Sequence, residues 1–166
     1  MDDLERLLAE RMIRRRLLEY CRGIDRCDAE LVASVYHPDG TDDHGAFRGL
    51  GVDFARYATE KLRDHAEATL HLLGDPLVDF LSDDAATVET YVHAEHRCRG
   101  ATGPYLELFG GRYVDRFERR DGEWRIAHRL CIREWDRRTP IEPAFPPDRF
   151  TEGRRDRADP AYGPSS

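Results

Sequence analysis

A histidine in an apolar strand is the residue of this sequence best suited to move a proton. His71 lies in the stretch ATLHLLGDPLVDF, residues 68–80, which predicts one strand with an imidazole on its alternating face. Asp25, far upstream, is a plausible carboxylate partner for this ring. A carboxylate fixes the tautomer and stabilises the imidazolium that forms, so such a pair can take a proton from carbon near neutral pH. A lone strand histidine is otherwise more often a hydrogen-bonded structural residue.

The helix before Asp25 predicts where the carboxylate lies. Apolar residues recur at helical spacing in segment 3–22, with arginines and glutamates on the other side, and predict an amphipathic helix whose apolar positions are Leu4, Leu7, Leu8, Met12, Leu17, Leu18 and Cys21. We expect Gly23 to end this helix and Asp28 to cap a short second one, AELVASVY. Asp25 would then lie in the turn between the helices, with Tyr20 near enough to point into the same cavity.

The remaining segments predict an α+β fold. Residues 37–51 are rich in turn formers and predict a short strand or hairpin, and residues 52–64 predict a third helix. Four stretches that alternate apolar and polar residues follow, with FGGR indicating a bulge or bend: ATLHLLGDPLVDFL, ATVETYVHAEHRC, YLELFGGRYVDRFERR and EWRIAHRLCIREW. Such strands can curl into one strongly bent antiparallel sheet wrapped by helices. We expect one domain over residues 1–138 and an extended Pro- and Arg-rich tail over 139–166.

Composition excludes several classes of protein. Acidic residues outnumber basic ones by 33 to 26, and the net charge of -7 leaves no basic field for nucleic acid. The four cysteines form no C-x-x-C pair, and the N-terminus lacks a signal-peptide pattern, so we expect a reduced cytoplasm. No window approaches 18 consecutive apolar residues, which argues against a membrane span.

Neither metal ligation nor nucleotide binding is indicated by a motif. The seven histidines include no H-E-x-x-H, and His93-x-x-His96 would place its two side chains on opposite faces of a strand. No G-x-G-x-x-G or P-loop is present. We therefore expect no metal site and a reaction that needs no cofactor.

The chain resembles the SnoaL-like branch of the nuclear transport factor 2 (NTF2) superfamily in the predicted order of its elements, which is helix, Asp-bearing turn, helix, hairpin, helix and four strands. The run GGRYVDRFERRDGEWRIAHR adds to this likeness, which covers roughly residues 3–137. The resemblance implies an NTF2-like cone in which three N-terminal helices pack on a strongly curved mixed or antiparallel sheet. It is closest to the dehydratase type, which includes scytalone dehydratase, bile-acid dehydratase and lindane dehydrochlorinase.

Four residues match functional positions of these enzymes. Tyr20 and Asp25 in YCRGID match the Tyr or Lys and the Asp that close the first helix, and His71 matches the base histidine. The spacing is H-x-x-x-x-x-H here, where lindane dehydrochlorinase has H-x-x-x-H. Arg129, five residues after Trp124, matches the position of the pocket arginine. The resemblance thus implies that Asp25 orients His71 as general base, while Tyr20 and Arg129 stabilise the anion or assist the leaving group.

Further residues are expected to contact a substrate. Asp42, Asp43 and His44 lie in GTDDHG, where the family brings its hairpin toward the pocket mouth, and Asp43 is the one we select, although a solvated loop also accounts for all three. On the strand 86–98, one face carries Tyr91, His93, Glu95 and Arg97, and the other carries Thr90, Val92, Ala94 and His96. If the first face looks inward, Tyr91 and His93 are further donors; otherwise they lie on an outer face that could contact another subunit. His128 competes with Arg129, since only one of two adjacent strand residues can point inward.

The resemblance implies a cofactor-independent lyase that acts by dehydratase-type elimination on a small, largely apolar cyclic or polyketide-like substrate. An isomerase or polyketide cyclase could use the same pocket, since enolisation is the shared first step, and Asp25 could itself be the base, as an Asp is in ketosteroid isomerase. A non-catalytic binding or assembly subunit, like the small subunits of ring-hydroxylating dioxygenases, is the alternative from another class. Superfamily members commonly pair through the outer sheet face, so a homodimer or homotrimer is expected.

Overall fold

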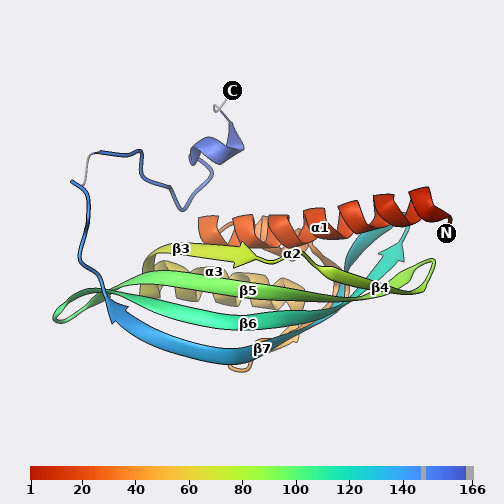
Figure 1. Cartoon of the computed structure of the whole chain (residues 1–166), viewed down its shortest axis with the longest axis horizontal. Coiled ribbons are helices and arrows are strands. Elements are labelled where there is room, and N and C mark those ends of the chain that lie inside the picture. The colour runs from red at the N-terminus through yellow and green to blue at the C-terminus, as the bar shows by residue number, and fades with distance from the viewer. Residues whose placement is uncertain (147–148, 164–166) are drawn as a thin grey trace.

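A computed structural model describes residues 1–146 and 149–163 and shows an α+β fold in which helices pack on one curved sheet (Figure 1). The elements follow one another as α1 (Asp3–Arg26), α2 (Ala29–Ser34), β1 (Tyr36–Asp43), β2 (Arg48–Leu50), α3 (Gly51–His65), β3 (Ala66–Leu73), β4 (Leu77–Ser82), β5 (Ala85–Gly100), β6 (Gly103–Arg120) and β7 (Glu123–Pro140). A 3-10 turn, Pro160–Tyr162, lies in the tail. The expected cone of helices on a strongly curved mixed sheet is confirmed. None of the described helices combines the length and the apolar character needed to cross a bilayer.

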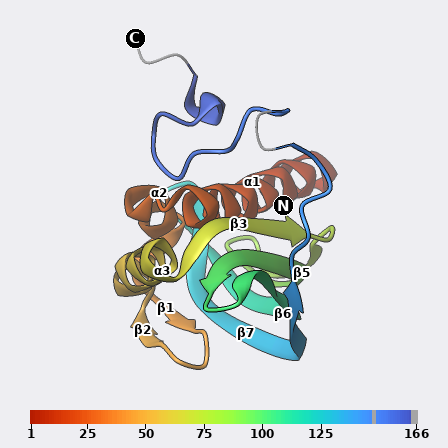
Figure 2. The same cartoon turned by 90° about the vertical axis from the view of Figure 1, so that its left-hand side faces the viewer.

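The sheet is mixed, and its strands run in the order β2-β1-β7-β6-β5-β3, with β4 also paired to β5. Strand β1 is parallel to β7, and the other neighbours are antiparallel. Figure 2 shows how strongly the sheet bends, with α3 lying along its open side. The register of β6 with β7 shifts at Gly110 and Gly111, where a Cβ on Gly110 would lie 2.3 Å from the Trp135 ring. The bulge expected at FGGR is therefore present.

The stretch 68–80 forms two strands rather than the single one expected. Strand β3 ends at Leu73, and β4 begins at Leu77 after Gly74-Asp75-Pro76. Both strands pair with the long β5, since Leu73 faces Val92 and Leu77 faces Glu89. Proline has no backbone N–H to donate to the ladder, and it interrupts the strand just after the half that carries His71.

Helix α1 is longer than expected, and Gly23 lies within it. The helix ends at Arg26, because Cys27 adopts the left-handed conformation with φ of 51° and its N–H caps the carbonyls of Gly23 and Ile24. A Cβ on Gly23 would lie 2.6 Å from Cγ2 of Val32, so the glycine serves the close approach of α2. Asp25 consequently sits in the last helical turn, not in the inter-helix turn we expected, whereas Asp28 caps α2 as expected.

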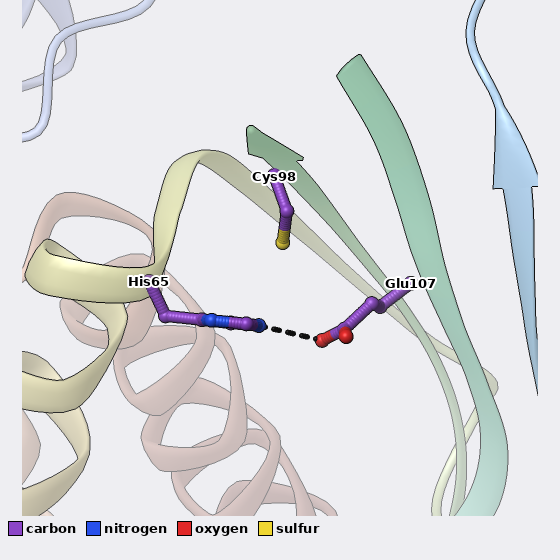
Figure 3. Close-up of side chains that lie close together, drawn as sticks. All are labelled: His65, Cys98 and Glu107. Carbon is purple, nitrogen blue, oxygen red and sulfur yellow. Dashed lines mark hydrogen bonds and ion pairs between the residues drawn. The ribbon is translucent and has the colours of Figure 1, made fainter. Parts of the chain in front are cut away.

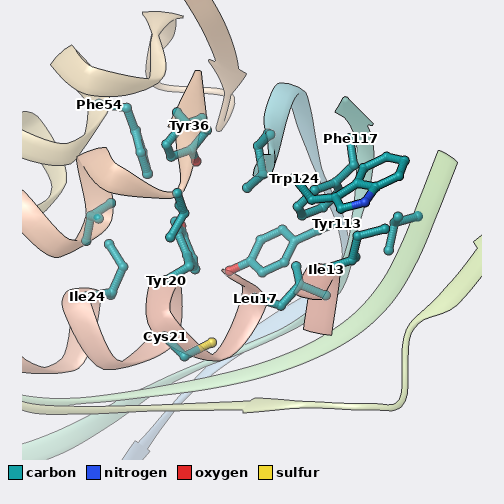
Figure 4. Packing of buried hydrophobic residues seen from close by; sticks show 14 of the residues in the cluster. Ile13, Leu17, Tyr20, Cys21, Ile24, Tyr36, Phe54, Tyr113, Phe117 and Trp124 are labelled. Carbon is teal, nitrogen blue, oxygen red and sulfur yellow. The ribbon is translucent and has the colours of Figure 1, made fainter. Parts of the chain in front are cut away.

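The buried side of α1 shares Leu17 and Cys21 with the expected one but otherwise differs from it. The residues that enter the core are Ala9, Ile13, Leu17, Tyr20, Cys21 and Ile24, whereas Leu4, Leu7, Leu8, Met12 and Leu18 are exposed. Both sets satisfy helical spacing, so periodicity alone does not choose between them. Figure 4 shows Ile13, Leu17 and Tyr20 of α1 packed with Tyr113, Phe117 and Trp124 of the sheet.

A buried ion pair joins β6 to β7 beneath this core. Arg129 is fully buried and donates from Nε and from a terminal nitrogen to the two carboxylate oxygens of Asp115, at 2.8 and 2.6 Å. Its guanidinium carbon lies 4.3 Å from the centre of the Tyr20 ring and 4.0 Å from that of Tyr113. The cation is thus enclosed by one carboxylate and two aromatic faces, which compensate its loss of hydration.

The tail after β7 folds back toward α1 and α2 (Figure 2). A guanidinium nitrogen of Arg155 donates to Sγ of Cys27 at 2.9 Å, and the Tyr162 hydroxyl donates to the Asp28 carboxylate at 3.1 Å. The tail is irregular, and its described residues Arg155 and Tyr162 contact the end of α1 and the N-cap of α2. The expected division into a domain and an extended tail stays a prediction.

We expect Asp115→Asn to lower the free energy of unfolding by about 3 to 5 kcal/mol, because it leaves the Arg129 cation buried without its counter-charge. Urea unfolding of the variant and the wild type measures this difference. The paired substitution Asp115→Leu with Arg129→Met should recover most of the loss, since it removes both charges and keeps the volume. A loss for Asp115→Asn below about 1 kcal/mol would show that the ion pair does not hold the two strands.

Candidate functional site

The helices and the concave side of the sheet enclose a cavity of about 830 Å³ that is open to solvent. Much of its lining is apolar or aromatic, from Ile24, Ala46, Phe54, Tyr57, Ala58, Leu62, Ala94, Phe109 and Tyr113. Polar side chains also line it, namely Tyr20, His44, Lys61, Asp64, His65, His71, His96 and Glu107. Such a mixture, in which a few placed polar groups interrupt apolar walls, is typical of a small-molecule site.

The His71 imidazole is held by Asp25, as the sequence predicted. Nδ1 of His71 lies 2.8 Å from Oδ1 of Asp25, and the two side chains are 7% and 10% exposed. The same carboxylate accepts the backbone N–H of His71 at 3.1 Å and the Thr69 hydroxyl at 2.9 Å. Because Asp25 accepts hydrogen bonds, Nδ1 carries the proton and Nε2 carries the lone pair. The ring is therefore oriented as a general base on the wall of the cavity.

A second histidine, His96, stands beside His71, and sequence reasoning did not select it. The two ring centres are 5.6 Å apart, and His96 also lines the cavity. Burial and then the neighbouring His71 lower the pKa of His96 to about 4. Among the described residues, its Nε2 has no hydrogen-bond partner. His96 therefore stays neutral near pH 7, where it offers a polar edge without a charge.

The inward face of β5 is the one that carries Ala94 and His96. Tyr91, expected to contact substrate, is 62% exposed on the other face, and His93 there packs its ring 5.7 Å from that of Trp135. Both residues lie outside the cavity lining, and this corrects the expectation. Strand alternation separated the two faces in the sequence, but only the helices covering one side decide which face is inward.

Tyr20 lines the cavity, whereas Arg129 lies behind it. Burial raises the pKa of the Tyr20 hydroxyl well above its usual range, and the Arg129 cation opposes that rise. Arg129 is committed to Asp115 and contacts Tyr20 only through its ring face. Its influence on a substrate would be exerted through Tyr20, not by the direct contact we expected. His128 points to the opposite side of β7, where its Nδ1 lies 2.7 Å from the Thr41 hydroxyl.

The hairpin contributes Asp42 and His44 to the interior instead of Asp43. Nδ1 of His44 lies 2.5 Å from Oδ1 of Asp42, whose side chain is fully buried. The His44 ring stacks on Phe54 with 4.4 Å between ring centres. Asp43 points outward and pairs with Arg48 at 3.0 Å, so it does not take the substrate-binding position we expected. Alternation along β1 separates the two adjacent aspartates, but the sequence does not show which one is buried.

One group of potential metal ligands occurs in the described part of the chain. His65, Cys98 and Glu107 place their ligand atoms within 4.8 Å of one another (Figure 3), and His65 and Glu107 also line the cavity. The Glu107 carboxylate already binds Nε2 of His65 at 2.8 Å and Arg138 at 2.8 Å. Burial raises the pKa of the Cys98 thiol, which favours the protonated form over the thiolate that binds metal. The candidate ligand atoms of His65 and Glu107 are thus already hydrogen-bonded within the protein. The expectation that no metal is used remains a prediction.

Comparison with known proteins places this geometry in a family. The model of the SnoaL-like domain matches residues 5–130. No match to a curated protein was found. A structure from Novosphingobium aromaticivorans DSM 12444, provisionally named a scytalone dehydratase, is 24% identical, with a TM-score of 0.74 over 91% of this chain and 100% of that one.

Two further solved structures share the fold at lower identity. Hexachlorocyclohexane dehydrochlorinase LinA-type3 from Novosphingobium barchaimii LL02 is 20% identical, with a TM-score of 0.77 over 88% of this chain and 100% of that one. The provisionally named β subunit of an aromatic-ring-hydroxylating dioxygenase from N. aromaticivorans is 19% identical, with a TM-score of 0.62 over 78% and 91%. Enzymes and a subunit of a larger assembly thus share this architecture, and the site must distinguish them.

We expect the low pKa of His96 to make the free energy of unfolding depend on pH. With a pKa of about 4 when folded and about 6.5 when unfolded, the unfolded chain binds more protons between these values, so stability falls as the pH is lowered through that window. The full contribution is about 3 kcal/mol. Urea unfolding from pH 5 to 8 covers about 2 kcal/mol of it, and His96→Gln should flatten this part of the curve whereas His93→Gln on the outer face should not. An unchanged curve for His96→Gln would contradict the assignment.

Proposed function

The chain belongs to the SnoaL-like domain family, and on this premise we propose that it is a cofactor-independent lyase that eliminates a leaving group from a small cyclic or polyketide-like substrate. One observation carries the proposal: His71 is hydrogen-bonded through Nδ1 to buried Asp25 on the wall of a largely apolar cavity. This is the arrangement that a general base for carbon acids requires.

The proposed reaction begins with proton removal by His71. Nε2 takes a proton from a carbon next to a carbonyl, and the Asp25 carboxylate stabilises the imidazolium while keeping the ring in place. The negative charge that develops on the substrate oxygen needs a hydrogen-bond donor, because general-base help alone is worth only about 10²- to 10⁴-fold. Tyr20 also lines the cavity, and its hydroxyl can donate to that oxygen or to the departing group.

The cavity also supports the proposed substrate class. A volume of about 830 Å³ with aromatic walls fits a molecule of one to a few rings better than a chain of charged groups. Arg129, the one arginine that the resemblance placed at the pocket, is already neutralised by Asp115. A carboxylate or phosphate on the substrate would therefore not find its counter-ion in Arg129.

An isomerase that shares the first step is the second candidate function. His96 lies beside His71, with ring centres 5.6 Å apart, and could guide the return of a proton to a different carbon of the same enolate. Cyclisation would proceed from the same enolate. The product distinguishes these reactions, since elimination releases a leaving group whereas isomerisation and cyclisation release none.

We expect His71→Gln to lower kcat/KM for elimination from cyclic β-hydroxy ketones by about 10²- to 10⁴-fold, because glutamine cannot act as the base. Asp25→Asn should also lower it, because the asparagine cannot stabilise the imidazolium. Absorbance of the new conjugated double bond measures the rate. His93→Gln, on the outer face, is the matched control and should retain activity.

The unfolding curve separates loss of chemistry from loss of fold. His71→Gln should keep the thermal midpoint within a few degrees of the wild type, since a single polar contact is lost at the cavity wall. Full turnover by a folded His71→Gln protein would disprove His71 as the base. If the wild type bound the cyclic ketone tightly but did not turn it over, the non-catalytic alternative would be favoured.

A further inference from the structure

A second histidine and carboxylate pair faces the same cavity as the first. His44 and Asp42 of the hairpin repeat the relation of His71 to Asp25, with Nδ1 bound to a buried carboxylate. Nε2 of His44 lies 3.4 Å from the Tyr20 hydroxyl, which lines the cavity. We propose that Asp42, His44 and Tyr20 form a proton relay that delivers a proton to the leaving group, so that the substrate loses water from a hydroxylated carbon. This inference rests on the proposed function, because it assumes that His71 starts an elimination.

The pair is fixed in place by its surroundings. Asp42 accepts a hydrogen bond from the Tyr36 hydroxyl at 2.6 Å in addition to the contact with His44. The His44 ring lies nearly parallel to Phe54, with an angle of 19° between their planes. The Asp42 side chain is fully buried, and burying a charged carboxylate costs free energy unless it is paired or hydrogen-bonded. The site therefore holds an oriented imidazole at the cavity wall, and not a freely rotating loop histidine.

The relay starts from a His44 ring that carries a proton on both nitrogens, and the neighbouring charged groups leave room for that cation. Asp115 and Arg129 neutralise each other through two hydrogen bonds. Asp42 accepts from Tyr36, which is neutral, so His44 is its closest group that can become cationic. The other titratable groups against His44 are Tyr20 at 3.4 Å and Tyr113, whose ring centre is 5.7 Å away. A protonated His44 would balance the Asp42 charge that remains.

The relay balances protons and electrons through one turnover. His71 Nε2 takes the proton from the carbon next to the carbonyl, and the electron pair of that C–H bond becomes the new C=C bond. The bond between carbon and the leaving oxygen breaks as the Tyr20 hydroxyl protonates that oxygen, and Nε2–H of His44 reprotonates Tyr20. Water leaves, His71 releases its proton to solvent, and His44 takes one up again.

The relay selects the class of leaving group. Hydroxide is a poor leaving group and must be protonated as it departs, whereas chloride leaves without a proton. Burial raises the pKa of Tyr20, so its hydroxyl alone is a weak acid. His44 compensates for this because it returns a proton to Tyr20 as Tyr20 donates its own. His44 acts on the substrate through Tyr20 and is in this sense a positioning residue. A chain that eliminated only halides would have no use for it.

A matched pair of substrates tests the relay in the full-length protein. We expect His44→Gln to lower kcat by about 10²-fold or more for a cyclic β-hydroxy ketone and by less than about threefold for the β-chloro ketone of the same ring. Tyr20→Phe, which keeps the ring over Arg129, should slow the β-hydroxy ketone at least as much as His44→Gln does, and the double variant should lose no more on that substrate than Tyr20→Phe alone. His71→Gln should slow both substrates. Equal losses on the two substrates, or none, would overturn the relay.

A readout without turnover keeps the inference separate from the proposed function. In ¹⁵N-edited spectra of histidine-labelled protein, we expect the His44 signals to show a proton on Nε2 as well as on Nδ1, because the relay donates from Nε2, and we expect Tyr20→Phe to shift the Nε2 resonance of His44 but not that of His93. Failure of the wild type to eliminate either substrate would refute the proposed function and the relay's role in it. Unshifted His44 signals in a protein that does turn over would refute the relay alone.

Discussion

The Asp25 carboxylate is the group on which both the fold and the chemistry of this protein depend. From the last turn of α1 it accepts hydrogen bonds from the Thr69 hydroxyl, the His71 backbone and the His71 ring, and so ties the helix end to β3. These bonds compensate the burial of a charge, which would otherwise be costly. Any shift of α1 along β3 would break them together. The base is therefore oriented by a contact that the structure already needs.

The pairing of Asp25 with His71 could be predicted from the sequence, but the position of Asp25 in the helix could not. The pairing of Asp25 with His71 and the α+β cone followed from strand alternation, helix spacing and the family resemblance. The position of Asp25 inside α1 did not, because Gly23 resembles a helix end and is in fact the point where α2 packs closely. Helical spacing likewise allowed two apolar sides for α1, and only the packing of the sheet selects the one with Ile13 and Ile24.

The other site residues depend on which face of a strand is covered. Asp42 and Asp43 are neighbours of the same type, yet one is buried against Tyr36 and the other pairs with Arg48 at the surface. The same alternation places His96 in the cavity and His93 outside it. A sequence gives the two faces of a strand but not their environment, because that depends on elements distant in the chain. Arg129 shows the same limit, since its partner Asp115 lies on the adjacent strand.

The buried charges explain how a proton could cross this cavity at low cost. Arg129 and Asp115 form a neutral pair. Lys61, Asp64 and Glu107 also line the cavity, but the groups that exchange protons are two carboxylates, Asp25 and Asp42, each with one imidazole that can gain or lose a proton. In the proposed elimination His71 gains a proton as His44 loses one, so the total charge of the cavity does not change. In a medium of low dielectric constant, a reaction that left an unbalanced charge would have a higher barrier, because that charge would be desolvated without a counter-charge.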